Sequence, residues 1–280
     1  MILFPNCKIN LGLRVMGKRA DGYHNIETVF YPLPLKDAAE LTPASKNTTQ
    51  DFELNISGIA IPGDKQNNLC YKAWQLIKND FPVIEPVRMH LLKAIPAGAG
   101  LGGGSSDGAH TLLLLNHELK LNLTREQLIA YALELGSDCP FFILNKPCFA
   151  AGRGEIMKET ETGLNDHYFV LVDPEVHIST AWAFEKLASD RRHHEQSLTD
   201  IVSSPVAQWK DKLLNDFEAP VFEEYESLKL VRDELYSSGA IYASLTGTGS
   251  CVYGIFPAKT KPDLHKITDH YKVYHLKQHG

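Results

Sequence analysis

The stretch Pro96-Ala-Gly-Ala-Gly-Leu-Gly-Gly-Gly-Ser-Ser106 decides how this chain is interpreted. Five glycines fall within seven residues, from Gly98 to Gly104. Glycine adopts positive φ without steric cost and lets another group approach the backbone closely. The stretch leads into a predicted helix over 105–119 with a serine N-cap, and the N–H groups and dipole of a helix N-terminus favour an anion. The sequence therefore predicts a phosphate-binding loop.

Two known phosphate motifs do not explain this loop. The spacing Gly98-x-Gly100-x-x-Gly103 matches the dinucleotide fingerprint, but that motif needs a strand after the helix and an acid about 20 residues on. Here Thr124-Arg-Glu-Gln127 predicts a capping box and a second helix instead. A Walker A sequence, with its own lysine, is absent. A lysine for the phosphates must therefore come from elsewhere in the chain. A tight turn without a ligand is the alternative, although fewer glycines would serve it.

Composition narrows the class of protein. The chain has 280 residues, 44% hydrophobic and 22% charged, which is typical of a globular protein. The net charge of −6 argues against a broad nucleic-acid surface. No apolar run approaches the ~20 residues of a membrane span, and the N-terminus lacks a signal-peptide layout. We expect a cytoplasmic protein without nucleic-acid or membrane partners.

The cysteines indicate reduced thiols. They are scattered and form no C-x-x-C pair, which argues against both a disulfide framework and a zinc site. Their positions are Cys7, Cys70, Cys139, Cys148 and Cys251. Cys139 adjoins a candidate catalytic acid, and we interpret it as a packed side chain rather than a nucleophile. The sequence identifies no metal ligands.

Strand-like and helix-like segments are mixed along the chain, which predicts an α+β fold. Period-two or apolar runs predict strands at 8–15, 26–31, 52–56, 87–92, 168–172 and 251–256. Helical spacing predicts helices at 68–79, 105–119, 124–135, 180–187 and around 217–237. The polar stretch 189–204 is predicted to be mobile. Pro140 is expected to exclude Cys139 from a helix and to leave Asp138 on a short connection.

Three segments together resemble one known family, the GHMP kinases: Lys8-Ile-Asn-Leu-Gly-Leu13, the glycine loop and Leu245-Thr-Gly-Thr-Gly-Ser-Cys251. Two further segments, Arg19-Ala-Asp-Gly-Tyr-His24 and Gly136-Ser-Asp-Cys-Pro-Phe141, resemble one member of that family more closely. The resemblance implies two α+β domains with the active site in the cleft between them. We place the division near residue 160, giving an N-terminal domain 1–160 with the ATP loop and the catalytic aspartate. The C-terminal domain 161–280 then lies on the substrate side and holds the second glycine-rich loop.

The resemblance also implies roles for particular residues. Asp138 matches the catalytic aspartate and Lys8 the lysine beside it. Positions for the nucleotide, near the adenine or in the phosphate cradle, are Asn68, Lys93, Pro96, Gly98, Gly100, Gly102, Gly103, Gly104, Ser105 and Ser106. Positions for the substrate, including a cytosine pocket, are Asn10, Tyr23, His24 and Phe184. Two departures from some members are Ala99, acceptable if its φ is negative, and Asp107, whose charge would oppose a phosphate.

The implied reaction is transfer of the γ-phosphate of ATP, with Mg²⁺, to the 2-hydroxyl of a cytidyl sugar-alcohol diphosphate used for isoprenoid precursors. Asp138 would accept the hydroxyl proton, and Lys8 would keep Asp138 ionised. Two alternatives remain open: a sibling kinase or decarboxylase acting on homoserine or mevalonate-type substrates, and a non-catalytic nucleotide-binding module. The aromatic pair Tyr23–His24 is the feature that favours a cytidyl substrate.

Overall fold

The computed structural model describes residues 1–44, 50–61, 63–164, 166–187, 196–260 and 262–277. The chain folds into two compact units, and neither is continuous in sequence. The first comprises Met1–Cys7, Leu35–Ala97 and Gly102–Lys146; the second comprises Lys8–Pro34, Gly98–Leu101 and Pro147–Gly280. The glycine loop thus contributes to both units. The division near residue 160, which concerns continuous sequence domains, stays a prediction.

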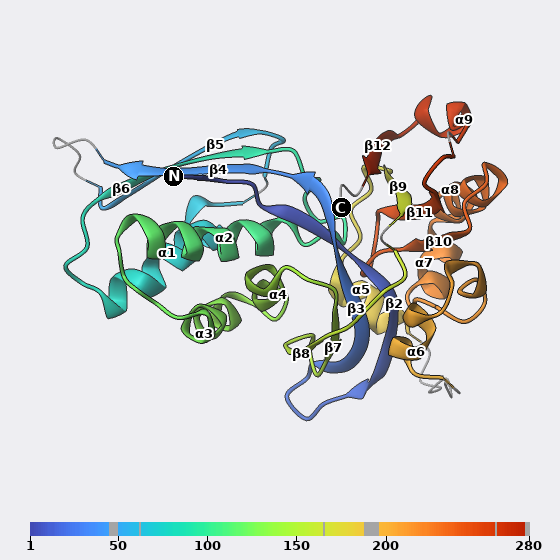
Figure 1. Ribbon diagram of the computed structural model, residues 1–280, viewed down its shortest axis with the longest axis horizontal. Coiled ribbons are helices and arrows are strands. Elements are labelled where there is room, and N and C mark those ends of the chain that lie inside the picture. Colours follow the sequence, from blue (N-terminus) through green and yellow to red (C-terminus); the bar gives the residue numbers. More distant parts are fainter. Residues whose placement is uncertain (45–49, 62, 165, 188–195, 261, 278–280) are drawn as a thin grey trace. The chain divides into compact units, whose positions relative to one another are not determined.

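The first unit is a four-stranded sheet with helices on one face (Figure 1). Its strand order is β1-β4-β6-β5, and only the β5–β6 pair is parallel. The elements are β1 (Ile2–Leu3), β4 (Ala38–Pro43), β5 (Phe52–Gly58), β6 (Val87–Lys93), a 3₁₀ turn (Lys65–Asn67), α1 (Leu69–Asp80), α2 (Gly103–Glu118), α3 (Arg125–Leu135) and α4 (Cys139–Leu144). Alternate residues of β6 are buried, as expected for a strand that covers a core with one face.

The helix ends of this unit confirm some predictions and correct others. Thr124 and Gln127 form the predicted capping box of α3. The predicted serine N-cap of α2 is wrong, because Gly102 caps that helix in the left-handed conformation and both serines lie inside its first turn. The exclusion of Cys139 from a helix is also wrong. Pro140 lies in the first turn of α4, where the missing N–H of proline is not needed.

The second unit contains two four-stranded sheets. One has the order β2-β3-β7-β8, formed by β2 (Asn6–Lys18), β3 (His24–Lys36), β7 (Cys148–Ala151) and β8 (Ile156–Glu159). The other has the order β10-β11-β9-β12, formed by β9 (His167–Asp173), β10 (Tyr242–Leu245), β11 (Val252–Pro257) and β12 (Lys272–Lys277). All pairs in this second sheet are antiparallel. These sheets confirm the predicted α+β class.

The helices of the second unit differ in two places from those expected. They are α5 (Thr180–Lys186), α6 (Leu198–Ser203), α7 (Glu218–Glu224), α8 (Glu226–Ser237) and α9 (His265–Thr268), with a 3₁₀ turn at Val206–Gln208. The single helix predicted around 217–237 is two helices that meet at Tyr225. Part of the polar stretch 189–204, where no helix was predicted, forms α6 with Ser197 as its N-cap, while 189–195 lie outside the described residues.

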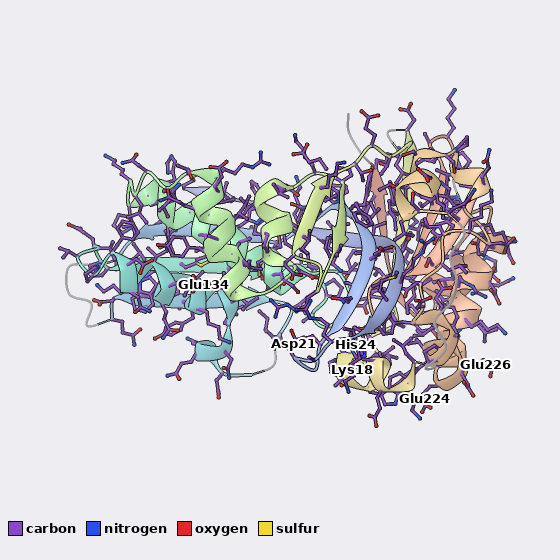
Figure 2. All side chains as sticks on the ribbon, turned by 90° about the horizontal axis from the view of Figure 1, so that it is seen from below. Lys18, Asp21, His24, Glu134, Glu224 and Glu226 are labelled. Carbon is purple, nitrogen blue, oxygen red and sulfur yellow. The ribbon has the colours of Figure 1, made fainter. Side chains whose placement is uncertain are left out.

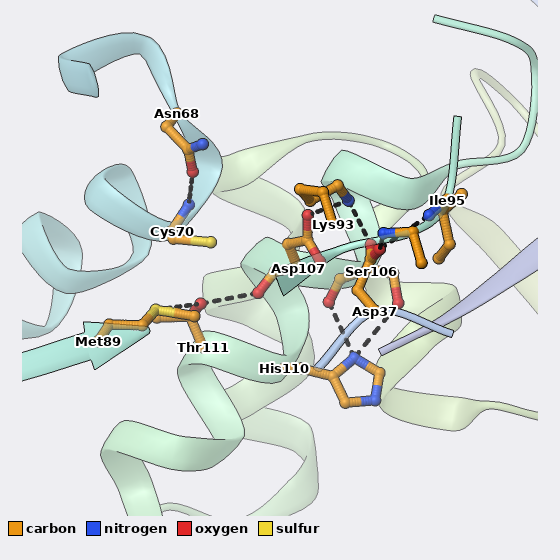
Figure 3. Close-up of polar contacts among 11 residues, drawn as sticks. Asp37, Asn68, Cys70, Met89, Lys93, Ile95, Ser106, Asp107, His110 and Thr111 are labelled. Carbon is orange, nitrogen blue, oxygen red and sulfur yellow. Dashed lines mark hydrogen bonds and ion pairs between the residues drawn. The ribbon is translucent and has the colours of Figure 1, made fainter. Parts of the chain in front are cut away.

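A buried group of charges links three segments of the first unit (Figure 3). The ammonium of Lys93, at the end of β6, donates to Asp37 Oδ2 and, at 2.6 Å, to Asp107 Oδ2. All three residues are at most 4% exposed. Asp37 Oδ1 also accepts from the backbone N–H groups of Ala94 and Ile95, at 2.6 and 2.9 Å. We call Asp37, Lys93 and Asp107 the ion cluster.

The ion cluster has a consequence for stability. Burial raises the pKa of Asp107 from 3.8 to about 7, and the nearby Asp37 carboxylate adds to this, although Lys93 acts in the opposite direction. The folded protein therefore binds a proton that the unfolded chain releases between about pH 4 and pH 7. This proton stabilises the fold fully below the unfolded pKa, and its contribution is lost as the pH rises through the folded pKa.

We predict that wild-type protein gains about 1–2 kcal/mol of unfolding free energy between pH 8.0 and pH 5.5 relative to Asp107→Asn, which cannot take up that proton. Urea denaturation of both proteins at the two pH values measures this difference. Titrating groups outside the ion cluster contribute equally to both proteins and cancel in the comparison. The same pH dependence in the variant and the wild type would contradict the prediction.

Candidate active site

The first half of the glycine loop, 98–101, packs against the second glycine-rich loop within the second unit. Gly98 and Gly100 have φ of +70° and +79°. A Cβ on Gly100 would lie 2.2 Å from the backbone oxygen of Thr246, so only glycine fits there. The loop is also tied to its neighbours by backbone hydrogen bonds, from Lys8 to Leu101 O at 2.9 Å and from Cys251 to Ala99 O at 3.2 Å. Ala99 is not among the described residues with positive φ, as its presence in the loop requires.

Lys8 is a buried lysine in β2 whose ammonium points at the loop. It donates to Gly100 O at 3.0 Å and to Asn10 Oδ1 at 2.8 Å, and it lies 5.2 Å from the centre of the Phe30 ring. The Asn10 amide is oriented by Thr28, whose hydroxyl oxygen accepts from Asn10 Nδ2 at 2.9 Å. Both ends of this amide are therefore engaged, and its oxygen holds the ammonium of Lys8. The edge-strand, water-exposed alternative for Lys8 is excluded by its 4% exposure.

Thr246 joins these parts together. Its hydroxyl accepts from the backbone N–H of Asn10 at 3.1 Å and lies 3.2 Å from Gly100 O, to which it donates. Asn215 supports the second loop from the other side, donating to Leu245 O and Gly247 O at 2.9 Å each. Sequence reasoning singled out neither Thr246 nor Asn215 as a site residue.

The second half of the glycine loop begins helix α2 in the first unit. Gly103 is buried, and a Cβ there would lie 2.9 Å from Ile95 Cγ2, so this glycine is required by packing. Gly104 is exposed, and a Cβ there would meet nothing within 4 Å. Ser105 is half-buried, whereas the Ser106 hydroxyl is buried and lies 3.4 Å from His110 Nδ1. Gly104 and Ser105 therefore form the open surface of the helix N-terminus.

Asn68 and Lys93, both expected near the adenine, have hydrogen-bond partners within the first unit. Asn68 is the N-cap of α1 and accepts from Cys70 N through Oδ1 at 2.8 Å, which leaves its amide donors for other partners. Lys93 is the centre of the ion cluster and is 4% exposed. Asp107, which was expected to oppose a phosphate, is paired with Lys93 instead.

Asp138 is half-buried at the N-cap of α4, in the first unit. Its side chain forms no capping hydrogen bond with α4, so the helix itself does not occupy the carboxylate. The neighbouring Cys139 is fully buried, and burial raises the pKa of its thiol to about 12, with Asp138 as a further cause. This thiol is inert at neutral pH, which confirms its interpretation as a packed side chain.

Tyr23 lies on the turn between β2 and β3, where Figure 2 marks Lys18, Asp21 and His24. Asp21 holds the turn: its carboxylate accepts from the Tyr23 N–H at 3.1 Å and pairs with Arg19 at 3.0 Å. Tyr23 is 57% exposed, which is unusual for so large a ring. The guanidinium of Arg153 lies over that ring, 5.1 Å from its centre.

His24 and Phe184, both expected in the cytosine pocket, form a stacked pair with ring centres 4.6 Å apart and planes at 15°. A base cannot lie between two rings that already stack on each other. Burial lowers the pKa of His24, and Lys18 adds to this effect, so the imidazole is neutral at pH 7. A neutral imidazole offers one donor and one acceptor, which suits the polar edge of a base.

Arg153 is the functional candidate that sequence reasoning missed. It belongs to the segment Gly152-Arg-Gly-Glu155, whose glycines both have positive φ. The turn is held by Ile26, whose N–H donates to Gly152 O at 2.7 Å, and by Glu155 Oε2, which accepts from the Arg153 N–H at 2.5 Å. The two glycines signalled a shaped turn, but no local pattern indicated that it would place a cation on Tyr23.

The described residues contain no group of three or more His, Cys, Asp or Glu side chains that could hold a metal ion. Within the same ranges, no helix is long and apolar enough to cross a membrane.

Comparison with known proteins agrees with this geometry. Residues 68–146 match the GHMP kinases N-terminal domain, and 197–272 match the GHMP kinases C-terminal domain. A curated protein from Bacteroides fragilis, named 4-diphosphocytidyl-2-C-methyl-D-erythritol kinase, is 48% identical over 261 residues, covering 93% of this chain and 94% of its own. A protein of the same name from Bacteroides thetaiotaomicron is 46% identical over 264 residues, covering 94% and 95%.

Solved structures support the same assignment. The crystal structure of a 4-(cytidine 5'-diphospho)-2C-methyl-D-erythritol kinase aligns with a TM-score of 0.83 and 28% identity, covering 99% of this chain and 98% of its own. Mevalonate kinase from Methanococcus jannaschii aligns with a TM-score of 0.72, covering 100% and 98%, but at 14% identity it shows only the shared fold. The chain belongs to the GHMP kinases.

Proposed function

We propose that this kinase transfers the γ-phosphate of ATP to the 2-hydroxyl of 4-diphosphocytidyl-2-C-methyl-D-erythritol, in non-mevalonate isoprenoid precursor synthesis. The observation that carries the proposal is the 46–48% identity to curated kinases of that name across 93–94% of the chain. The exposed Tyr23 beside the neutral His24 provides a surface suited to a cytosine ring. A sibling activity on homoserine or mevalonate has less support, since those structures are only 14% identical to this chain.

The glycine loop would hold the triphosphate through backbone N–H groups. The open start of α2 at Gly104 and Ser105 offers N–H groups without intrahelical partners, together with the positive end of the helix dipole. Phosphoryl transfer depends mostly on positioning and charge stabilisation, so a rigid cradle is a direct contribution to rate. Asn68 would contribute its amide donors to the adenine.

Asp138 and Lys8 would carry the chemical step. Asp138 would accept the proton of the attacking hydroxyl, or orient that hydroxyl for attack. Lys8 would counter negative charge on the moving phosphoryl group, held in place by Asn10 and Gly100 O. Thr28 contributes indirectly, because it fixes which end of the Asn10 amide faces the lysine.

Magnesium would arrive with the nucleotide. The described residues offer no cluster of three acidic, histidine or cysteine ligands, and Mg²⁺ commonly relies on substrate phosphates with one or two protein ligands. When bound, the ion would neutralise part of the phosphate charge. The five buried thiols suit the reducing cytoplasm, which we propose as the location of the enzyme.

The substrate assignment is tested by ADP release. We expect turnover with 4-diphosphocytidyl-2-C-methyl-D-erythritol and none with its nucleotide-free sugar alcohol, homoserine or mevalonate. Comparable turnover with homoserine or mevalonate would replace the proposal with a sibling activity. Absence of ADP release with all four compounds, in a protein that binds ATP, would favour a nucleotide-binding module.

The role of Asp138 predicts the behaviour of Asp138→Asn, which keeps the size of the side chain but removes the proton acceptor. We expect kcat to fall by about 10²–10⁴-fold. The Kd for ATP should change little. Stopped-assay kinetics and calorimetry on one preparation measure both quantities. A variant that keeps more than about a tenth of wild-type kcat would rule out the base role.

The cradle predicts different effects for its neighbouring glycines. In Gly104→Val the new side chain has room within the fold, but it covers the N–H groups that would face phosphate. We expect the Kd for ATP to rise at least about tenfold with unchanged thermal stability. Gly103→Ala is the matched control, because its Cβ would press on Ile95 and should lower stability instead. Normal ATP binding by folded Gly104→Val would mean that the loop is structural only.

If Tyr23 stacks on the base, Tyr23→Ala should weaken binding of the cytidyl substrate and not that of ATP. Stacking of a base on an aromatic ring is worth about 1–3 kcal/mol in nucleic-acid binders, so the KM for the cytidyl substrate should rise by roughly 5- to 150-fold. The KM for ATP should barely move. Arg153→Gln, which removes the cation from the Tyr23 ring, should raise the same KM by a smaller factor. If the KM values for both substrates rose equally, or if neither rose, only the broader kinase assignment would remain.

A further inference from the structure

The ion cluster holds the segment that leads into the glycine loop and also the helix that follows the loop. Both segments belong to the first unit. The chain enters the loop through Ala94 and Ile95, whose N–H groups donate to Asp37 Oδ1 at 2.6 and 2.9 Å. It leaves the loop in α2, where Asp107 Oδ2 accepts from Lys93 at 2.6 Å. The ammonium of Lys93 joins the two carboxylates, as Figure 3 shows.

Side-chain packing makes the same connection. The buried Gly103, first residue of α2, leaves no room for a Cβ against Ile95, and that Cβ position lies only 3.5 Å from Lys93 Nζ. The start of the phosphate-binding helix therefore rests directly on the strand end that carries Lys93. A displacement of either segment would separate the ammonium from one of its carboxylates, which is costly for charges that are this deeply buried.

Lys93 is poorly placed to contact a ligand itself. Its side chain is 3% exposed, and its ammonium already donates to two carboxylates that are themselves 0% and 3% exposed. The Cys70 thiol of α1 also faces the cluster, and burial raises its pKa far above neutrality, so it adds no charge. One oxygen of Asp107, Oδ1, is buried without a hydrogen-bond partner among the described residues. The groups named here therefore surround the Lys93 ammonium with protein.

We propose that the ion cluster Asp37–Lys93–Asp107 is a clamp that positions the N-terminal turn of α2 to bind phosphate, and that Lys93 acts through this turn instead of touching the adenine. The inference rests on the proposed function, since it concerns the same nucleotide. Asp37 and Lys93 are positioning residues in this account. A change at either residue should therefore affect the binding of every ligand that carries the phosphates, whichever base it has.

The experiment compares binding of ATP, GTP and inorganic tripolyphosphate by calorimetry. The main variant is Lys93→Gln combined with Asp107→Asn. Binding is measured at pH 8.0, where Asp107 is ionised, so the two changes remove one positive and one negative charge and leave the net charge of the cluster unchanged. We expect the affinities for ATP and tripolyphosphate to fall by the same factor, about tenfold, the low end for loss of a supporting outer-shell partner. The ratio of ATP to GTP affinity should stay as in the wild type.

A control and a second variant complete the test. Arg88→Gln with Glu53→Gln removes an ion pair between β6 and its neighbour β5, away from the loop, and should leave all affinities unchanged. Asp37→Asn keeps an acceptor for both backbone N–H groups, so it should fold even if the double variant does not. It should weaken tripolyphosphate binding in the same direction by a smaller factor.

Two results would overturn the proposal. A loss confined to ATP, with tripolyphosphate binding intact, would mean that Lys93 contacts the base. Unchanged binding of all three ligands by the folded variants would mean that the cluster supports the fold alone. Failure of wild-type protein to bind either ATP or tripolyphosphate would instead refute the proposed function, and this inference with it.

Discussion

The close approach of two backbones at Gly100 is the constraint on which the candidate site depends. A Cβ at this residue would lie 2.2 Å from Thr246 O, so the first glycine loop can meet the second only because Gly100 has no side chain. That contact exposes Gly100 O to two donors, Lys8 Nζ and the Thr246 hydroxyl. The loop therefore has a second role beside phosphate binding. Its carbonyl oxygen fixes the lysine that would meet the phosphoryl group.

Buried charge is the second feature of the site, and each charge is held differently. Lys8 donates to neutral oxygens, those of the Asn10 amide and of the Gly100 carbonyl. Lys93 lies between the carboxyl groups of Asp37 and Asp107. The two buried lysines therefore have surroundings of different kinds. Residue type alone would have given both lysines the same role.

The sequence predicted those parts of the protein whose causes are local. The five glycines of the loop, the capping box at Thr124 and the alternation along β6 each follow from a few neighbouring residues. The partner of Lys93 could not be predicted, because Asp37 lies 56 positions away and nothing in its local pattern marks it. The same holds for Arg153 above Tyr23. The wrong N-cap of α2 had a different reason. A serine is the usual N-cap, but here Gly102, with positive φ, caps the helix three residues before the first serine, Ser105.

Specificity for a base would depend on how the protein stabilises one exposed aromatic ring. A tyrosine that is 57% exposed gains little from the hydrophobic effect, so its orientation needs other support. The Asp21 turn supplies that support through the backbone, and Arg153 supplies it through one face of the ring. A guanidinium on one face leaves the other face for a flat ligand. Since Phe184 already stacks on His24, the sandwich of a base between Tyr23 and Phe184 requires that pair to separate, whereas stacking on the remaining face of Tyr23 requires no rearrangement. We therefore propose the ring of Tyr23 as the primary determinant of base recognition, and the His24–Phe184 pair as the group that reads the edge of the base.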